Sequence, residues 1–173
     1  METIGKYDVG DVVAYVTYRL GSVGSLKKLM KLLFLIQYET RRLFTPRAVK
    51  FLYHGAPVTR AEFFIWSFGP MANEVYDALE DESRFRIEPA EEGPAYTVRY
   101  LGDPPKLPPP VAKRVDDVLK RYGGYKAWEL ERKVNQLLGL EPEKKEEYMG
   151  YAVDKYLQLE GFRLEIRDLA HGN

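Results

Sequence analysis

The sequence predicts an α+β fold that is predominantly helical, with a central buried helix, several helices packed around it and a β-hairpin. Three observations carry this prediction. Residues 26–36 are apolar around nearly the whole helical circumference, as in a helix enclosed by other elements. Residues 84–88 and 96–101 have the composition of strands and flank a turn-rich linker, which indicates a hairpin. The 173 residues, 45% of them hydrophobic, suffice for one domain over 1–173 with its own core.

The N-terminal part of the chain predicts two consecutive helices. The first covers residues 12–20, with Asp11 as its N-cap. Ser25 belongs to the residue types preferred as N-caps, and we expect it to begin the central helix, from residue 26 to about residue 42. This second helix should form the centre of the core.

The middle of the chain is less regular. Residues 48–53 fit either a helix or a strand, and residues 54–57 have the composition of a turn. The aromatic segment 63–68 suits a strand or a short helix. Pro70 is expected at the first position of a helix over residues 71–79, because a proline needs no backbone donor there.

The C-terminal part predicts three more helices after a proline-rich connector. Residues 102–110 contain five prolines and should be extended. Helical patterning then covers residues 111–122, 127–138 and 143–159. Apolar and polar residues alternate after the last helix and predict a short strand, so that this helix and strand together occupy 143–169.

The composition excludes several classes of function. The chain has no cysteine and only two histidines, which removes disulfides, zinc–thiolate sites and thiol nucleophiles. His54 has no cysteine partner, and neither a nucleophile-elbow nor a zinc-protease motif occurs. We therefore expect a non-enzymatic protein with no catalytic residue, no metal and no cofactor. A hydrolase site built from carboxylates alone is the catalytic alternative that the composition leaves open.

The sequence also indicates where the protein works. No apolar stretch approaches the roughly 18 residues of a membrane span, and residues 1–10 lack a signal-peptide pattern. A cytoplasmic protein without membrane contact is expected. Eleven prolines, many charged residues and only three Asn and three Gln favour a thermophilic source.

Charge is unevenly distributed although the net charge is zero. Between residues 27 and 60, eight basic residues accompany a single acid, Glu39, and we expect a basic surface that binds an acidic protein partner. The alternative is a winged-helix-like DNA- or RNA-binding protein, although Glu91 and Glu92 at the hairpin tip would repel phosphates. The predicted partner-binding residues are Lys27, Lys28, Lys31, Arg41, Arg42, Arg47, Lys50 and Arg60.

Two further groups of residues have both a functional and a structural interpretation. The lysines at the start of the central helix oppose the helix dipole, so they either meet an anionic partner or are solvated. The aromatic residues Phe63, Phe64, Trp66 and Phe68 either pack in the core, where we place Trp66, or form an exposed platform for a partner.

Several short segments, read in order, resemble the Panacea family, the antitoxin-like domains related to the SocA proteolytic adaptor. Residues 28–37 are similar to the family's Lys-Leu-Leu-Tyr helix, and residues 55–57 to its Gly-x-Pro turn. Residues 64–71 with 74–76 are similar to its Trp-x-x-Gly-Pro-Val motif and Val-Tyr helix, and residues 122–130 to its Tyr-Gly-x-x-Ser-Ala-x-x-Leu entry. The motif residues are Lys31, Gln37, Trp66, Gly69, Pro70, Tyr76, Tyr122, Gly123, Ala127 and Leu130.

The resemblance covers about residues 25–140 and implies a partner-neutralising module. It would bind a toxin protein, or act as an adaptor for its proteolysis, without chemistry of its own. The chain departs from the family pattern at Val134 and Asn135, where the family has a Thr-His pair, and it lacks the small-Pro-Trp sequence expected soon afterwards. A role of that histidine does not carry over to Asn135.

Overall fold

The computed structural model describes residues 6–42, 44–90 and 95–171 of the chain. Within these ranges the fold is α+β and predominantly helical, as the sequence predicts. The helices are α1 (Val9–Leu20), α2 (Leu26–Gln37), α3 (Asn73–Leu79), α4 (Pro109–Tyr122), α5 (Ala127–Leu138), α6 (Pro142–Glu147) and α7 (Val153–Leu159), with a 3-10 turn, η1, at Leu169–His171. The strands are β1 (Tyr38–Arg41), β2 (Arg47–Tyr53), β3 (Ala56–Pro57), β4 (Phe64–Trp66), β5 (Gly69–Met71), β6 (Phe85–Pro89), β7 (Tyr96–Tyr100) and β8 (Arg163–Asp168).

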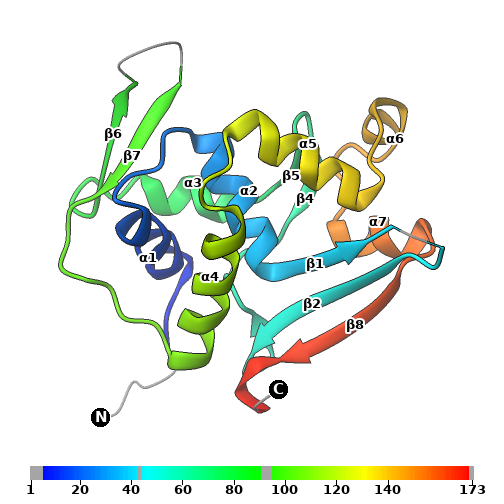
Figure 1. Cartoon of the computed structure of the whole chain (residues 1–173), viewed down its shortest axis with the longest axis horizontal. Helices are drawn as coiled ribbons and strands as arrows, with labels where there is room; N and C mark the ends of the chain where they lie inside the picture. The colour runs from blue at the N-terminus through cyan, green and yellow to red at the C-terminus, as the bar shows by residue number, and fades with distance from the viewer. Residues whose placement is uncertain (1–5, 43, 91–94, 172–173) are drawn as a thin grey trace.

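Helix α2 is the centre of the core. It begins where the Ser25 hydroxyl accepts the Lys28 N–H at 3.3 Å, as the sequence predicts. All nine residues of its segment 29–37 are buried, and it packs against α1, α4, α5 and β5. Figure 1 shows it in the middle of the molecule, with α1 and α4 on one side and the β1–β2–β8 sheet on the other. Each of its large aliphatic side chains contributes about 1.5–3 kcal/mol by leaving water.

The predicted end of this helix, near residue 42, is wrong. Helix α2 ends at Gln37, and Tyr38 turns into extended backbone at φ −129° and ψ 140°. The reason lies far along the chain, because the Arg114 guanidinium donates to the backbone carbonyls of Leu35 and Ile36 at 2.9 and 3.0 Å. These carbonyls are thereby satisfied without another helical turn. Burial alternates over the next four residues, which form β1.

The first helix begins earlier than predicted, and Asp8 rather than Asp11 is its N-cap. The Asp8 carboxylate accepts the Asp11 N–H, and the Asp11 carboxylate accepts the Asp8 N–H, both at 2.9 Å. This reciprocal capping box starts the helix at Val9.

Residues 48–53, left open between helix and strand, lie in β2, the central strand of a four-stranded sheet. Strand β2 pairs antiparallel with β1 and β3, and parallel with β8, with Arg47 opposite Arg163 and Leu52 opposite Asp168. The predicted C-terminal strand is thus confirmed, and Figure 1 shows it beside β2 although the two are more than 100 residues apart.

The helix predicted over residues 71–79 is present as α3, but its predicted start at Pro70 is wrong. Pro70 lies in β5 opposite Ile65 of β4, and α3 begins only at Asn73. A two-stranded edge tolerates a proline because its missing N–H faces away from the partner strand. Of the aromatic segment 63–68, Phe64–Trp66 form a strand and residues 67–68 form the turn after it.

The single helix predicted over residues 143–159 is divided into α6 and α7. Gly150 lies between them with φ +86°, which a helix does not accommodate. The Gly150 N–H donates to the Ile65 carbonyl at 2.8 Å, and the Ile65 N–H donates to the Tyr151 carbonyl at 2.9 Å. Pairing with β4 therefore replaces the helical hydrogen bonds.

The predicted hairpin is confirmed as β6 and β7, joined antiparallel from Phe85 opposite Tyr100 to Pro89 opposite Tyr96. The tip with Glu91 and Glu92 lies outside the described residues. The connector then runs without regular structure to α4. Among the described helices, none has both the length and the apolar character needed to cross a bilayer.

Candidate functional site

The three lysines at the start of α2 all have partners within the fold. Lys27 Nζ pairs with Glu131 Oε1 at 2.9 Å, and Lys28 Nζ donates to the Gly123 carbonyl at 2.7 Å. Lys31 Nζ donates to the Pro70 carbonyl at 3.0 Å. These partners offset the unfavourable position of the lysines relative to the helix dipole.

Lys31 does not belong to a basic surface. Its side chain is 2% exposed, and burial lowers its pKa from the usual 10.5 to about 7. The expectation that Lys31 lies on an exposed basic surface is therefore corrected, whereas its role in partner binding stays a prediction.

The other predicted basic residues lie mostly around the β1–β2–β8 sheet. Arg42 pairs with Glu160 at 3.6 Å, Arg47 with Glu165 at 3.1 Å and Lys50 with Asp154 at 2.6 Å, while Arg60 Nη1 donates to the Tyr53 carbonyl at 3.0 Å. Arg41 is exposed at the end of β1. Their role in partner binding stays a prediction.

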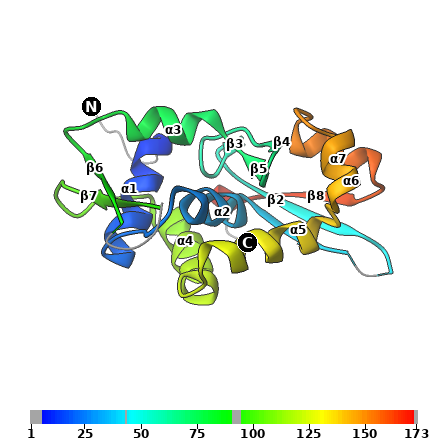
Figure 2. The same cartoon turned by 90° about the horizontal axis from the view of Figure 1, so that it is seen from above.

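A winged-helix protein needs its hairpin and its basic residues on one surface, and these residues do not have that arrangement. Arg41 ends β1 and Arg47 begins β2, so both lie near the β1–β2 turn. Figures 1 and 2 both show the β6–β7 hairpin at the opposite end of the molecule from that turn. The hairpin and these arginines therefore do not share one surface for a nucleic acid.

A small pocket brings together five of the motif residues predicted from the resemblance. It has a volume of about 140 Å³ and lies between α2, the β4–β5 hairpin and α3. We call it the motif pocket. It is lined by Lys27, Met30, Lys31, Trp66, Phe68, Gly69, Pro70, Met71 and Tyr76.

Gly69 is the point where the wall of the motif pocket meets α5. Its φ of +104° favours glycine, and a Cβ at this position would lie 2.6 Å from Asn135 Oδ1 and 3.4 Å from Lys31 Nζ. Asn135 Oδ1 is buried and has no hydrogen-bond partner among the described residues. The position at which this chain departs from the family's histidine thus lies against the motif glycine.

Exposed aromatic side chains surround the motif pocket. Trp66 is 45% exposed, Phe68 55% and Tyr76 41%, and Lys27 Nζ lies 4.1 Å from the centre of the Phe68 ring. The expectation that Trp66 fills the core is wrong. Phe63 does so instead, because side chains on successive strand residues point to opposite faces.

The remaining motif residues support the fold. Buried Gln37 donates to the Ala61 carbonyl at 3.1 Å and accepts from the Thr59 N–H and hydroxyl. Tyr122 and Leu130 are buried, and Ala127 begins α5. A Cβ at Gly123 would lie 2.5 Å from the Leu119 carbonyl oxygen. The end of α4 therefore accommodates a glycine, which has no Cβ.

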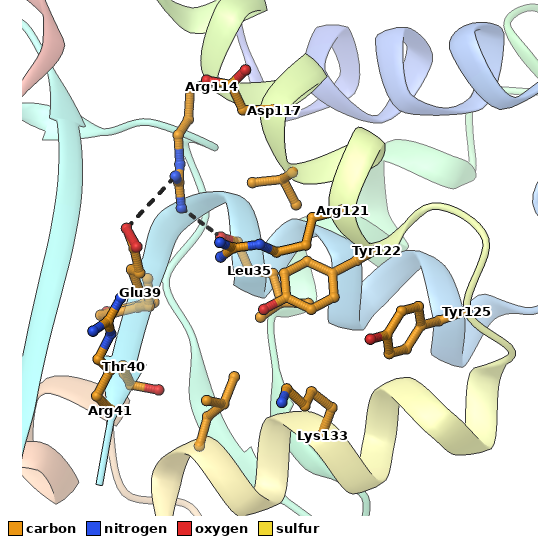
Figure 3. A pocket seen from close by; sticks show the side chains of 13 residues that line it. Leu35, Glu39, Thr40, Arg41, Arg114, Asp117, Arg121, Tyr122, Tyr125 and Lys133 are labelled. Atoms are coloured by element: carbon orange, nitrogen blue, oxygen red, sulfur yellow. Dashed lines mark hydrogen bonds and ion pairs between the residues drawn. The ribbon is translucent and has the colours of Figure 1, made fainter. Parts of the chain in front are cut away.

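A second, larger hollow of about 540 Å³ lies between β1, α4 and α5 (Figure 3). The sequence analysis missed most of its residues, although Arg114, Asp117 and Arg121 follow the spacing of one helix face. We call it the arginine groove. It is lined by Leu35, Tyr38, Glu39, Thr40, Arg41, Arg114, Asp117, Val118, Arg121, Tyr122, Tyr125, Lys133 and Leu137.

Among the cationic side chains of the arginine groove, Arg114 stabilises the fold. Besides binding two carbonyls of α2, its guanidinium lies 3.8 Å from the centre of the Phe51 ring and 3.9 Å from Glu39. Burial lowers its pKa to about 10, so it keeps its charge at neutral pH. Within the described ranges, no group of three or more His, Asp or Glu side chains is placed to hold a metal ion.

A comparison with models of known protein families finds a match. The sequence matches the family model of the antitoxin SocA-like Panacea domain over residues 29–137, more than half of the chain. The match includes Lys31 and Gly69, which line the motif pocket, and Asn135, which lies against Gly69. Among curated proteins and solved structures, no match is found. The chain therefore belongs to the Panacea family of antitoxin SocA-like domains.

Proposed function

We propose that this chain is a cytoplasmic, non-enzymatic antitoxin-like module that binds a protein partner at the motif pocket. The observation that carries the proposal is the set of three aromatic side chains, Trp66, Phe68 and Tyr76, each more than 40% exposed around a recessed site. Tryptophan and tyrosine are frequent anchors of protein interfaces, and clustered exposed apolar surface marks interaction sites.

The size of the motif pocket favours a side chain of a protein over a small molecule. Its volume of about 140 Å³ lies well below the roughly 300–1,000 Å³ typical of ligand sites. An apolar side chain inserted there would contact Met30 and Met71, whose flexible thioethers adapt to the shape of a partner.

The positive charge of Lys27 at the mouth of the motif pocket indicates what kind of partner segment can bind there. The Lys27 ammonium lies beside the ring of Phe68 and pairs with Glu131, but its side chain is about one-third exposed, so an acidic residue of a partner can still approach it. We expect a partner segment with an apolar anchor next to an acidic residue, since complementary charges increase the association rate and the specificity.

The family membership supports an antitoxin-like role for this contact. Two modes of action follow from it: the bound module covers the active surface of a toxin, or it presents the partner to a protease. Both need a protein contact and neither needs chemistry by this chain.

The test starts with affinity capture from cells of the source organism, with and without nuclease, followed by affinity measurement with the purified partner. Trp66→Ala should weaken binding at least about tenfold, as expected for an interface anchor. Trp128→Ala is the matched control, because Trp128 is 59% exposed on α5 and does not line the motif pocket. Equal affinity of the Trp66 variant and the native chain, or capture that depends on nucleic acid, would refute the proposal.

Co-expression distinguishes the two modes of action. If the module covers the toxin, it restores growth in a host lacking the relevant protease while the toxin level stays constant. If it is an adaptor, the toxin level falls and rescue requires the protease.

A further inference from the structure

The arginine groove has an excess of positive charge that the fold does not neutralise. Four cations line it, Arg41, Arg114, Arg121 and Lys133, against two acids. Both acids already have cationic partners: Glu39 lies 3.9 Å from Arg114, and Asp117 lies 3.1 Å from Lys113 outside the groove. Arg41, Arg121 and Lys133 form no ion pair within the described part of the chain, although all three line this hollow from three different elements.

The charges of the groove are held in place by the core. Arg114 is fixed by its hydrogen bonds to Leu35 and Ile36 and shields the carbonyl end of α2, whose partial negative charge would otherwise repel an anion. Arg121 belongs to the last turn of α4 and Lys133 to the middle of α5. Figure 3 shows these side chains and Arg41 around the same hollow.

A buried hydroxyl at the wall of the groove lacks a partner. Thr40 is 4% exposed, and its Oγ1 has no hydrogen-bond partner among the described residues. Unsatisfied buried hydroxyls are rare because each costs about 1–3 kcal/mol. Because Oγ1 itself is buried, it belongs to the wall behind the groove and does not contact a ligand in the open space.

The groove also has an apolar side suited to a flat ring. Tyr122 and Tyr125 form an edge-to-face pair with ring centres 5.5 Å apart, and the half-buried Tyr125 and Leu137 face the hollow. Its volume of about 540 Å³ lies within the range of small-molecule sites, unlike that of the motif pocket.

We propose that the arginine groove binds a nucleoside phosphate, with its phosphates at Arg41, Arg121 and Lys133 and its base against Tyr125 and Leu137. Arginine forks match phosphate oxygens, and aromatic rings stack on bases of any identity. This site is separate from the proposed partner contact, since the arginine groove and the motif pocket share no lining residue. Either proposal can fail alone.

The test measures binding of ATP, AMP, pyrophosphate and adenosine to the full chain by calorimetry at low and moderate salt. ATP should bind, with an affinity that falls as salt increases, and pyrophosphate and adenosine should each bind at least about tenfold more weakly than ATP. Arg121→Gln and Lys133→Gln should each lower ATP affinity about tenfold, the effect of one charge-assisted hydrogen bond. Lys120→Gln, an exposed position of α4 outside the groove, is the matched control and should bind like the native chain.

The base contact is tested separately with Tyr125→Ala. This change should lower ATP affinity about tenfold and leave pyrophosphate affinity unchanged, because only the nucleotide has a ring to stack. Thermal unfolding of each variant shows whether it is folded. The proposal is overturned by absence of ATP binding at millimolar concentration, by equal affinity for ATP and pyrophosphate, or by equal losses in the Lys120 and Arg121 variants.

Discussion

Lys31 should make the stability of this protein rise with pH above neutrality. Burial lowers its pKa to about 7 in the folded chain, whereas an unfolded lysine titrates near 10.5. Between these values the unfolded chain binds a proton that the folded chain has released, so alkaline conditions favour folding. Below pH 7 Lys31 is protonated in both the folded and the unfolded chain, so the folded chain bears the full cost of burying its charge.

The magnitude follows from the two pKa values. The slope approaches ~1.4 kcal/mol per pH unit, and integration from pH 7 to pH 8.5 gives a gain of about 1.6 kcal/mol in the free energy of unfolding. The measurement ends at pH 8.5 because burial raises the pKa of Tyr7 and Tyr156, so tyrosines that titrate near pH 10 in the unfolded chain oppose the gain at higher pH.

The assay is urea unfolding of the native chain and of Lys31→Met at half-unit pH steps. The methionine variant loses the hydrogen bond to the Pro70 carbonyl, which shifts its stability by a constant amount, but its curve should be nearly flat over this range. Lys120→Met, at an exposed position, should keep the native slope. Parallel curves for the native chain and Lys31→Met would refute the reasoning, because another group would then cause the pH dependence.

Three further predictions concern stability and are all measured by urea unfolding. Gly69→Ala should lower the free energy of unfolding by about 2–4 kcal/mol, since a side chain there has both a positive φ and a contact with Asn135. Gly150→Ala, whose Cβ would lie in open space, should lower it by only about 1 kcal/mol, and equal losses would contradict the steric contribution of Asn135. Asp8→Ala should cost about 1 kcal/mol through loss of the capping box, and Asp8→Asn much less, so similar losses would place the effect elsewhere. Arg114→Met should cost about 2–3 kcal/mol because the carbonyl end of α2 loses its donors, and a loss below 0.5 kcal/mol would show that water replaces them.

Local patterns were sufficient where an element depends on its own residues. Helices α4 and α5 and the β6–β7 hairpin lie within two residues of the predicted bounds. Their apolar periodicity and turn residues are encoded in continuous segments. The cap at Ser25 belongs to the same class, because a side chain and an N–H three residues later form it.

Prediction failed where a distant residue supplies the hydrogen bond that ends or replaces an element. Helix α2 stops at Gln37 because Arg114 satisfies its last carbonyls. The helix predicted over residues 143–159 breaks at Gly150 because that segment pairs with β4. The hydrophobic periodicity of the local sequence does not indicate either contact.

The candidate site shows the same division between sequence and tertiary structure. By itself, the sequence determined the helical α+β class, the buried central helix and, through its resemblance to the Panacea family, five of the residues that line the motif pocket. Only the tertiary structure decided that Lys31 is buried, that Trp66 is exposed and that Asn135 meets Gly69. It also brought Arg41, Arg121 and Lys133 to one groove. The physical reason is that burial and electrostatic environment depend on which segments pack together, and such segments can be far apart in the sequence, as strands β2 and β8 are.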